Sequence, residues 1–254
     1  MIRGFLVQRN EIQSAKKTEF QQIPFMTGQK RFIKKRVLIV DDHPFLRKGL
    51  SDFLDSQPDL ACCGDVGTPN DAMEFIAKTK PDIVLADLNL PGKGGMELIK
   101  DIRALHPELP IIVLTMHVES EFAKRSVLAG ARGYVAKSEP ETTLLAAIRQ
   151  VLNGKLFVSE QLAGHLIEHF AGGGVPSGPD SPSAHLTDRE LQVFTLVGQA
   201  SRTRDIAAEL HISIKTVEAH RANIKQKLGI TTSQELTRAA VRWVESRFNP
   251  RPQI

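Results

Sequence analysis

The stretch from Val84 to Gly95 reads VLADLNLPGKGG. It is an apolar run that ends on one carboxylate, Asp87, and continues through Asn89 into a segment of proline and glycine that is not helical. A charged group at the end of a buried strand is costly unless it is paired, bound to a metal or used in chemistry. The stretch therefore predicts a strand that presents Asp87 at a functional edge.

Similar apolar runs occur on both sides of this stretch, with helical patterns between them. Strands that alternate with amphipathic helices predict a parallel sheet covered by helices on both faces. We expect an α/β doubly wound, five-stranded parallel sheet of the flavodoxin-like type, with strand order 2-1-3-4-5. The predicted strands are Val37–Val40, Leu60–Asp65, Ile83–Ala86, Ile111–Thr115 and Gly133–Ala136.

A segment rich in glycine, proline and serine divides the chain. It reads AGGGVPSGPDSPSA, has no apolar period and is typical of a linker. We expect a basic, mobile tail in residues 1–35 and the α/β domain in residues 36–155. A linker with a short helix follows in residues 156–184, and a small all-α domain occupies residues 185–254.

The last part of the chain has only helical patterns. Capping boxes at Thr187 to Glu190 and Thr232 to Glu235 mark two helix starts. Two short helical windows, Thr203–Leu210 and Ile214–Leu228, are separated by the tripeptide HIS, in which Ser213 is the predicted helix cap. This spacing fits a helix-turn-helix, although a helical bundle with a solvated polar face has the same periodicity.

The overall composition is that of a soluble globular protein, with 41% hydrophobic and 24% charged residues. No apolar run is long enough to span a membrane, and no secretory signal pattern is present. Cys62 and Cys63 are adjacent and are expected to be free thiols, which favours a cytoplasmic location. The net charge of +4 comes mostly from residues 1–35, so it is weak evidence for nucleic-acid binding.

Acidic residues follow two of the predicted strands. Asp41 and Asp42 follow the first strand and Asp87 follows the third, and these strands are neighbours in the flavodoxin-like order. Three unpaired carboxylates repel one another, and a hard divalent cation such as Mg²⁺ removes this repulsion. Together with Thr115 and Lys137 at later strand ends, these groups suit phosphoryl transfer to the Asp87 carboxylate. Taken singly, each residue is more often a turn, cap or surface residue, and only the joint pattern favours this site.

Four segments resemble the receiver domain of bacterial two-component response regulators, and their sequences are similar to those of the NarL/FixJ subfamily. They read VLIVDDHPFLRKGL, DIVLADLNLPGKGG, IIVLTMH and GARGYVAK. The resemblance covers residues 36–152 and implies that a sensor histidine kinase phosphorylates Asp87. It also implies the groups around the phosphoacceptor: Asp41, Asp42, Asp87 and the backbone carbonyl of Asn89 for Mg²⁺, Lys137 for the phosphoryl group, and the switch residues Thr115 and Tyr134.

Residues 186–230 resemble the LuxR-type helix-turn-helix domain. The resemblance implies that Ile214–Leu228 is the recognition helix for double-stranded DNA. Small residues on its polar face allow close approach to base edges, Lys215 can reach phosphate and Glu218 can accept from cytosine. The predicted DNA-contacting residues are Lys215, Thr216, Glu218, Ala219, His220, Ala222 and Asn223.

The same resemblance implies that the last helix, about Ser233–Phe248, can form a homodimer on phosphorylation or on DNA. Its apolar stripe consists of Leu236, Ala240, Trp243 and Val244. One departure from the resemblance is Ala200, where many family members have glycine. This departure predicts a stiffer turn, not a loss of DNA binding.

The combined pattern predicts a transcription regulator that is switched by phosphorylation and is not an enzyme. The first alternative is an aspartate-nucleophile phosphatase, which needs a second acid two residues after the first. This chain has Asn89 at that position, which weighs against it. The second alternative is a constitutive DNA-binding protein with a vestigial receiver, and the presence of every expected receiver group disfavours it.

Overall fold

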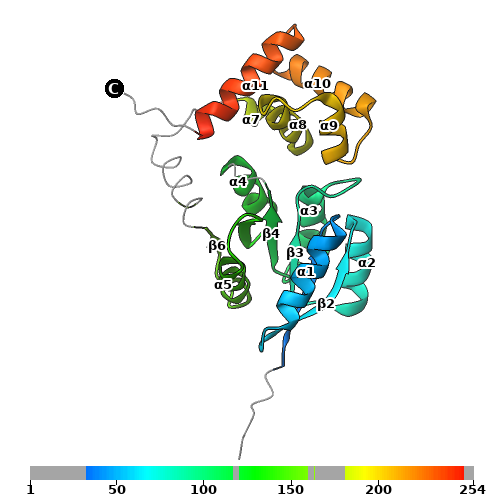
Figure 1. The fold of residues 1–254 in the computed structure, drawn as a ribbon, viewed down its shortest axis with the longest axis vertical. Coiled ribbons are helices and arrows are strands. Elements are labelled where there is room, and N and C mark those ends of the chain that lie inside the picture. Colours follow the sequence, from blue (N-terminus) through cyan, green and yellow to red (C-terminus); the bar gives the residue numbers. More distant parts are fainter. Residues whose placement is uncertain (1–32, 117–119, 160–162, 164–180, 249–254) are drawn as a thin grey trace, which may run out of the picture. The chain divides into compact units, whose positions relative to one another are not determined.

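The computed structural model describes residues 33–116, 120–159, 163 and 181–248. Its α/β domain is built on a parallel sheet with strand order β2-β1-β3-β4-β5-β6 (Figure 1). The predicted doubly wound parallel fold is confirmed. The strands are β1 (Lys35–Val40), β2 (Leu60–Val66), β3 (Ile83–Ala86), β4 (Ile111–Thr115), β5 (Gly133–Ala136) and β6 (Phe157–Val158). The helices between them are α1 (Pro44–Asp55), α2 (Pro69–Thr79), α3 (Gly95–Leu105), α4 (Ser120–Ala129) and α5 (Glu141–Leu152).

Two boundaries differ from the sequence prediction. The sheet has six strands instead of five, because Phe157 and Val158 pair with Gly133 and Tyr134 of β5. A strand of two residues is too short to show an alternating pattern, so this segment was assigned to the linker. At the other end, β1 begins at Lys35, inside the predicted tail. Most of the predicted tail and linker lies outside the described residues.

The two faces of the sheet are covered by different helices. Successive residues of a strand point to opposite faces, and β1 follows this rule. Leu38 and Val40 belong to a core shared with α2 and α3, whereas Val37 and Ile39 belong to a core shared with α1 and α5. The sheet is therefore held rigidly from both sides, and its carboxyl edge is left for function.

Glycine allows α3 to begin directly behind the end of β3. A Cβ atom at Gly95 would lie 1.9 Å from the carbonyl oxygen of Asp87, so no larger residue fits there without moving the backbone. The Gly95 N–H donates to the carbonyl of Leu88 at 3.0 Å. Gly95 thus allows the backbone of α3 to lie directly against the residue that carries the carboxylate.

The second domain consists only of helices in the part of the chain that the structure describes. They are α7 (Pro182–His185), α8 (Asp188–Gly198), α9 (Thr203–Glu209), α10 (Ile214–Lys227) and α11 (Ser233–Phe248). The two predicted capping boxes are present at Thr187 and Thr232. Ser213 caps α10 by accepting from the Thr216 N–H at 3.0 Å, as predicted.

The apolar stripe of α11 packs inside the helical domain. Leu236, Ala240 and Trp243 are buried, and the Trp243 ring meets Phe194 of α8 edge-on, with centroids 5.8 Å apart. A Cβ atom at Gly198 would lie 2.4 Å from the Ala240 carbonyl, so glycine permits this close crossing of α8 and α11. The assignment of this stripe to a dimer interface was therefore wrong, because a helix in a domain this small must use its apolar face for the core.

Ala200 adopts a backbone conformation that favours glycine, with φ of 61°. We expect Ala200→Gly to stabilise the helical domain by roughly 0.5–1 kcal/mol, because relief of the left-handed strain exceeds the added entropy of the unfolded chain. Denaturant unfolding followed by fluorescence of Trp243, the single tryptophan of the chain, measures this change. Ala208→Gly within α9 is the matched control and should destabilise the same domain. Destabilisation by both variants would rule out strain at Ala200.

Both cysteines are free thiols, as predicted. Burial raises the pKa of the Cys63 thiol, which makes it less reactive. No helix among the described residues has the length and apolar character needed to cross a membrane.

Candidate phosphorylation site and DNA-binding surface

Asp41 and Asp87 lie side by side at the carboxyl edge of the sheet. Val40 pairs with Ala86 in the register of β1 and β3, so the next residues of both strands emerge together. The Asp87 N–H donates to the Val40 carbonyl at 2.9 Å, which continues the ladder as far as the acid. The side chains are buried, with 2% of Asp41 and 3% of Asp87 exposed. Two carboxylates in this position require positive charge nearby.

Lys137 supplies positive charge at the end of β5. Its Nζ lies 2.6 Å from Asp41 Oδ2 and 2.7 Å from Asp87 Oδ2. Burial alone would lower the pKa of the ammonium group, but the charges and hydrogen bonds of Asp87 and Asp41 outweigh burial and raise it. The lysine therefore remains charged and joins the ends of three strands that are distant in sequence.

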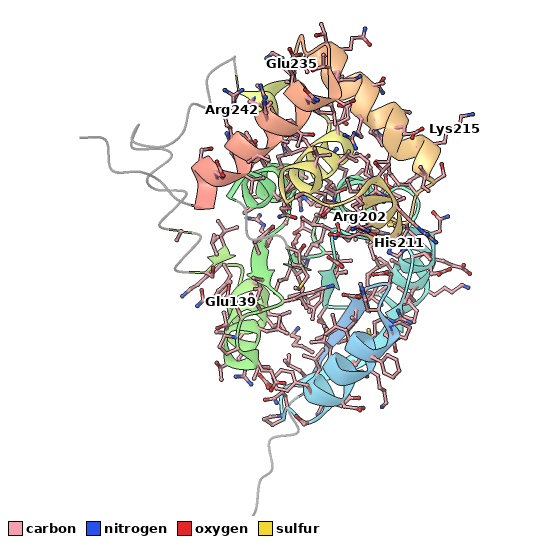
Figure 2. All side chains as sticks on the ribbon, turned by 45° about the horizontal axis from the view of Figure 1, so that its top comes forward. Glu139, Arg202, His211, Lys215, Glu235 and Arg242 are labelled. Carbon is pink, nitrogen blue, oxygen red and sulfur yellow. The ribbon has the colours of Figure 1, made fainter. Side chains whose placement is uncertain are left out.

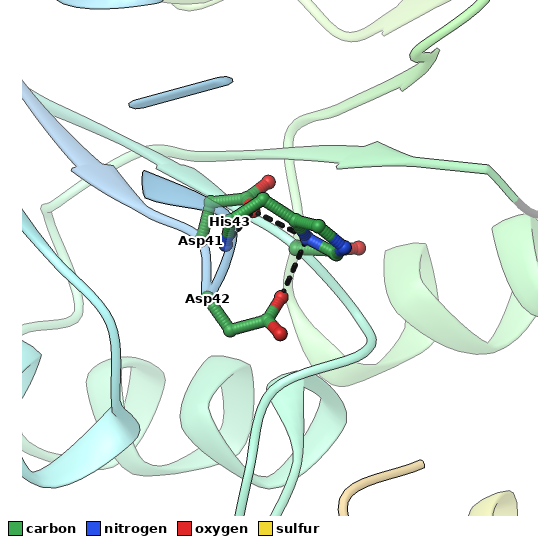
Figure 3. A group of neighbouring side chains, drawn as sticks. Asp41, Asp42 and His43 are labelled. Carbon is green, nitrogen blue, oxygen red and sulfur yellow. Dashed lines mark hydrogen bonds and ion pairs between the residues drawn. The ribbon is translucent and has the colours of Figure 1, made fainter. Parts of the chain in front are cut away.

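Asp42 and His43 complete the acidic cluster (Figure 3). The ring nitrogen Nδ1 of His43 lies 3.1 Å from Asp41 Oδ1 and 2.8 Å from Asp42 Oδ1. The backbone N–H of His43 donates to Asp41 Oδ1 at 2.8 Å. We did not predict His43 as a site residue, because its position before Pro44 reads as an ordinary helix start.

The side chains of this cluster fit a divalent cation. One ligand atom each from Asp41, Asp42, His43 and Asp87 can be chosen so that all lie within 4.8 Å of one another. Asp87 Oδ1 is buried and has no hydrogen-bond partner among the described residues. A buried carboxylate oxygen without a donor is expected to gain a cation or a donor when the site is in use. Oxygen ligands of this kind suit Mg²⁺.

The remaining predicted receiver residues lie around the cluster. Asn89 is buried, and its side-chain oxygen accepts from Nε2 of Gln192 at 3.2 Å, which leaves the predicted metal role to its backbone carbonyl. Thr115 is buried at the end of β4, and its carbonyl accepts from the Lys137 N–H at 2.8 Å. Tyr134 is buried in β5. Residues 117–119, which follow β4, lie outside the described residues.

The predicted recognition helix α10 presents a polar face. Val217 and Ile224 are buried in the core of the helical domain, which turns the opposite face outward. Figure 2 shows the Lys215 side chain projecting away from the ribbon near the start of α10. The exposed predicted contact residues are Lys215, Thr216, Glu218, Ala219, Ala222 and Asn223.

His220 differs from the other predicted contacts. It is half-buried, and burial followed by the charge of Arg189 lowers the pKa of its imidazole. The ring is therefore neutral near pH 7, which favours packing over a contact with phosphate.

An ion pair connects α8 with α10, with Glu190 buried and Lys227 exposed. Glu190 Oε2 lies 2.6 Å from Lys227 Nζ and accepts from the Thr187 N–H at 2.8 Å. Burial alone would raise the pKa of the Glu190 carboxyl, but the bonds from Lys227 and Thr187 lower it. Because the pKa of Glu190 is lower in the folded protein than in the unfolded chain, the ionised carboxylate stabilises the domain at pH values above the unfolded pKa. This stabilisation is lost as the pH falls through the folded pKa.

The Glu190→Gln variant tests this pair. We expect it to be less stable than wild type at pH 7. The difference should shrink as the pH falls from the unfolded value of roughly 4.3 through the lower pKa of the folded state, below which the wild-type carboxyl is also neutral. Unfolding followed by Trp243 fluorescence in a pH series from neutral down through this range measures the difference. Glu218→Gln, on the exposed face of α10, should not change stability at any pH in the series. A Glu190→Gln deficit independent of pH would contradict the ion pair.

Side chains of the helical domain contact the acidic edge and α4. His211 Nε2 lies 2.6 Å from Asp42 Oδ2, and Gln192 bonds Asn89 as described above. Arg125 of α4 donates to Asp188 Oδ1 at 2.7 Å and to the Leu186 carbonyl at 2.9 Å. These contacts could not be predicted from the sequence, since each partner alone reads as a surface residue.

Two family matches cover most of the described chain. Residues 37–149 match the response regulator receiver domain, and residues 184–240 match the LuxR family of bacterial regulatory proteins. A parallel α/β domain with acids at its carboxyl edge, joined to a helix-turn-helix domain, defines the class of DNA-binding response regulators. The chain belongs to the NarL/FixJ family of two-component response regulators.

Relatives of known name support this assignment. The chain is 34% identical to the response regulator GacA of Pseudomonas aeruginosa over 208 residues, which cover 82% of this chain and 95% of GacA. It is 33% identical to the oxygen regulatory protein NreC of Staphylococcus aureus over 215 residues, covering 82% of this chain and 97% of NreC.

Solved structures show the same architecture. A two-component response regulator of the LuxR family from Aurantimonas sp. SI85-9A1 is 36% identical, with a TM-score of 0.53, and covers 54% of this chain and 99% of its own. RcsB from Salmonella enterica serovar Typhimurium, bound to the promoter rprA in the presence of the phosphomimetic BeF3⁻, is 26% identical with a TM-score of 0.55. That match covers 82% of this chain and 98% of RcsB.

Proposed function

We propose that a sensor histidine kinase phosphorylates this response regulator on Asp87 and thereby switches its binding to double-stranded DNA. The observation that carries the proposal is the environment of Asp87. Its carboxylate is buried beside Asp41, Lys137 holds one of its oxygens, and the other has no hydrogen-bond partner among the described residues. The domain boundaries, a cytoplasmic location and a homodimer on phosphorylation or on DNA belong to the same proposal.

The residues of the site supply the charge that phosphoryl transfer requires. A carboxylate oxygen of Asp87 attacks phosphorus, the phosphorus–nitrogen bond of the donor breaks, and the imidazole leaves with that electron pair and gains a proton. Mg²⁺ held by Asp41, Asp42, Asp87 and the Asn89 carbonyl would offset the negative charge of the phosphoryl oxygens. Lys137 holds Asp87 before transfer and can bond the phosphoryl oxygens afterwards. Thr115 and Tyr134 are the proposed switch residues.

The Lys137→Ala variant tests whether Lys137 couples phosphorylation of Asp87 to DNA binding. We expect the variant to take up phosphate, since Asp87 is intact, but to show little or no phosphorylation-dependent gain in DNA affinity, because no ammonium links the new phosphoryl group to β5. DNA affinity is measured before and after phosphorylation, with the extent of phosphorylation checked by intact mass. Lys93→Ala removes an exposed lysine from the neighbouring loop and should respond like wild type. A normal response by the phosphorylated Lys137→Ala variant would count against the role of Lys137.

DNA recognition is assigned to α10. Its exposed face combines small residues with Lys215, Glu218 and Asn223, a set able to reach both phosphate and base edges. Because the apolar stripe of α11 is part of the core, a dimer contact on α11 would use its opposite face. That face borders a shallow groove lined by Arg238, Val241 and Arg242 among others.

Intact-mass analysis with a small phosphodonor tests the proposed function. The protein is incubated with the donor and Mg²⁺, and a parallel sample contains a chelator instead of Mg²⁺. We expect a stable gain of one phosphoryl group that depends on Mg²⁺. Consumption of the donor without an adduct would favour the phosphatase alternative, and no reaction would favour a vestigial receiver.

A further inference from the structure

His43 lies at the solvent-exposed side of the acidic cluster and directs a ring nitrogen toward it. Its Nδ1 atom faces Asp41 Oδ1 at 3.1 Å and Asp42 Oδ1 at 2.8 Å (Figure 3). His43 and Asp87 both belong to the group of residues that can each offer one ligand atom within 4.8 Å of the others. The imidazole is therefore directed at the place where the three carboxylates converge.

The backbone holds His43 in this position. Its N–H donates to Asp41 Oδ1 at 2.8 Å, and Pro44, at the start of α1, follows it directly. His43 is the N-cap residue of α1, yet its side chain makes no capping hydrogen bond. The imidazole ring therefore contacts the carboxylates of Asp41 and Asp42 and does not cap the helix.

A second observation points to a cation at this place. Asp87 is a buried member of the cluster. Its Oδ1 atom has no hydrogen-bond partner among the described residues. Lys137 satisfies the other oxygen, Oδ2, at 2.7 Å. An incoming cation would satisfy Oδ1 and offset the remaining negative charge of the three acids.

We propose that His43 is an additional ligand that sets the metal preference of the site, so that cations with affinity for imidazole bind through His43 as well as the carboxylates. Mg²⁺ is satisfied by oxygen ligands and water, whereas Co²⁺ and Mn²⁺ accept mixed nitrogen and oxygen ligands. Co²⁺ stands above Mn²⁺ in the general order of affinities and is the sharper probe. This inference rests on the carboxylate site of the proposed function and adds a determinant of its specificity.

Metal titrations of the full-length protein test the role of His43. Co²⁺ and Mg²⁺ are each titrated calorimetrically into wild type and His43→Asn, which keeps a polar side chain of similar shape. We expect the Co²⁺ dissociation constant to rise by about tenfold or more, the scale of losses around metal ligands. The Mg²⁺ constant should change by less than about twofold, because oxygen ligands suffice for it.

Nuclear magnetic resonance gives a readout that does not depend on affinity. In the Co²⁺-loaded wild type, the Nε2–H proton of a ligating imidazole is shifted far outside the normal range, and this signal should be missing in His43→Asn. His106→Ala is the histidine control, since His106 is the C-cap residue of α3 and lies outside the cluster. It should retain both the signal and the Co²⁺ affinity.

The outcomes separate this inference from the proposed function. Wild type that binds Mg²⁺ in an Asp87-dependent manner, with His43→Asn losing no Co²⁺ affinity or losing both metals equally, would overturn the role of His43 alone. Mg²⁺ affinity that is unchanged in Asp87→Asn would instead overturn the carboxylate site. Selective loss of Co²⁺ binding together with loss of the shifted signal would establish His43 as the ligand.

Discussion

Replacing Asp87 with asparagine is expected to abolish phosphoryl uptake and to leave the fold intact. The amide matches the carboxylate in size but is a poor nucleophile, so no phosphoaspartate forms at this position. Removal of one of two adjacent buried acids also lowers the repulsion within the cluster, so the α/β domain should not become less stable. Intact mass after incubation with a phosphodonor and Mg²⁺ measures uptake, and thermal unfolding measures the fold.

Asp101→Asn is the matched control for this variant. Asp101 is a partly exposed acid in α3 near Lys93, at a different place from the cluster. We expect its uptake to equal that of wild type. Phosphorylation of Asp87→Asn at the wild-type level would remove Asp87 from the role of phosphoacceptor.

Loss of the Arg125 side chain is expected to increase the DNA affinity of the unphosphorylated protein by about tenfold, equivalent to about 1.4 kcal/mol. Arg125 joins α4 to the helical domain through Asp188 and the Leu186 carbonyl, and both charged side chains are largely buried. We propose that these contacts, with those of His211 and Gln192, restrain the helical domain until phosphorylation. Removal of these contacts favours a state in which the helical domain is released from the α/β domain. The larger population of this state raises the measured affinity for DNA.

The Arg125→Ala measurement uses a DNA duplex selected from random sequences by the phosphorylated protein. Lys124→Ala is the control, since it removes an equal charge from the neighbouring position of α4. We expect the control to bind like unphosphorylated wild type. If the two variants have equal affinities, the contacts of Arg125 do not restrain DNA binding.

The acidic edge was predictable because local patterns mark the ends of the strands and the flavodoxin-like order makes the first and third strands neighbours. Buried apolar runs placed Asp41 and Asp87 at strand ends, and a parallel sheet brings neighbouring ends together. Lys137 followed from the same logic, as the residue after β5. The role of His43 was not predictable, since a histidine before a proline is usually a helix start. Only the folded structure brings its Nδ1 atom to two carboxylates.

The predictions failed where packing between distant segments decides the outcome. The stripe of α11 read as a surface for a second subunit, but α8 covers it, as the contact of Trp243 with Phe194 shows. The strand β6 is too short for a pattern and exists because β5 offers an open edge. Arg125 and Asp188 meet across 63 residues of sequence, a separation at which residue spacing carries no information about contact.

The central claim is that phosphorylation of Asp87 controls DNA binding, and one comparison of affinities tests it most directly. Wild type and Asp87→Asn are each titrated with the selected duplex, at one salt concentration, before and after treatment with the phosphodonor and Mg²⁺. We predict that treatment increases the affinity of wild type and leaves that of Asp87→Asn unchanged. An equal response of both proteins, or the absence of a response in wild type that carries the phosphoryl group, would contradict the claim.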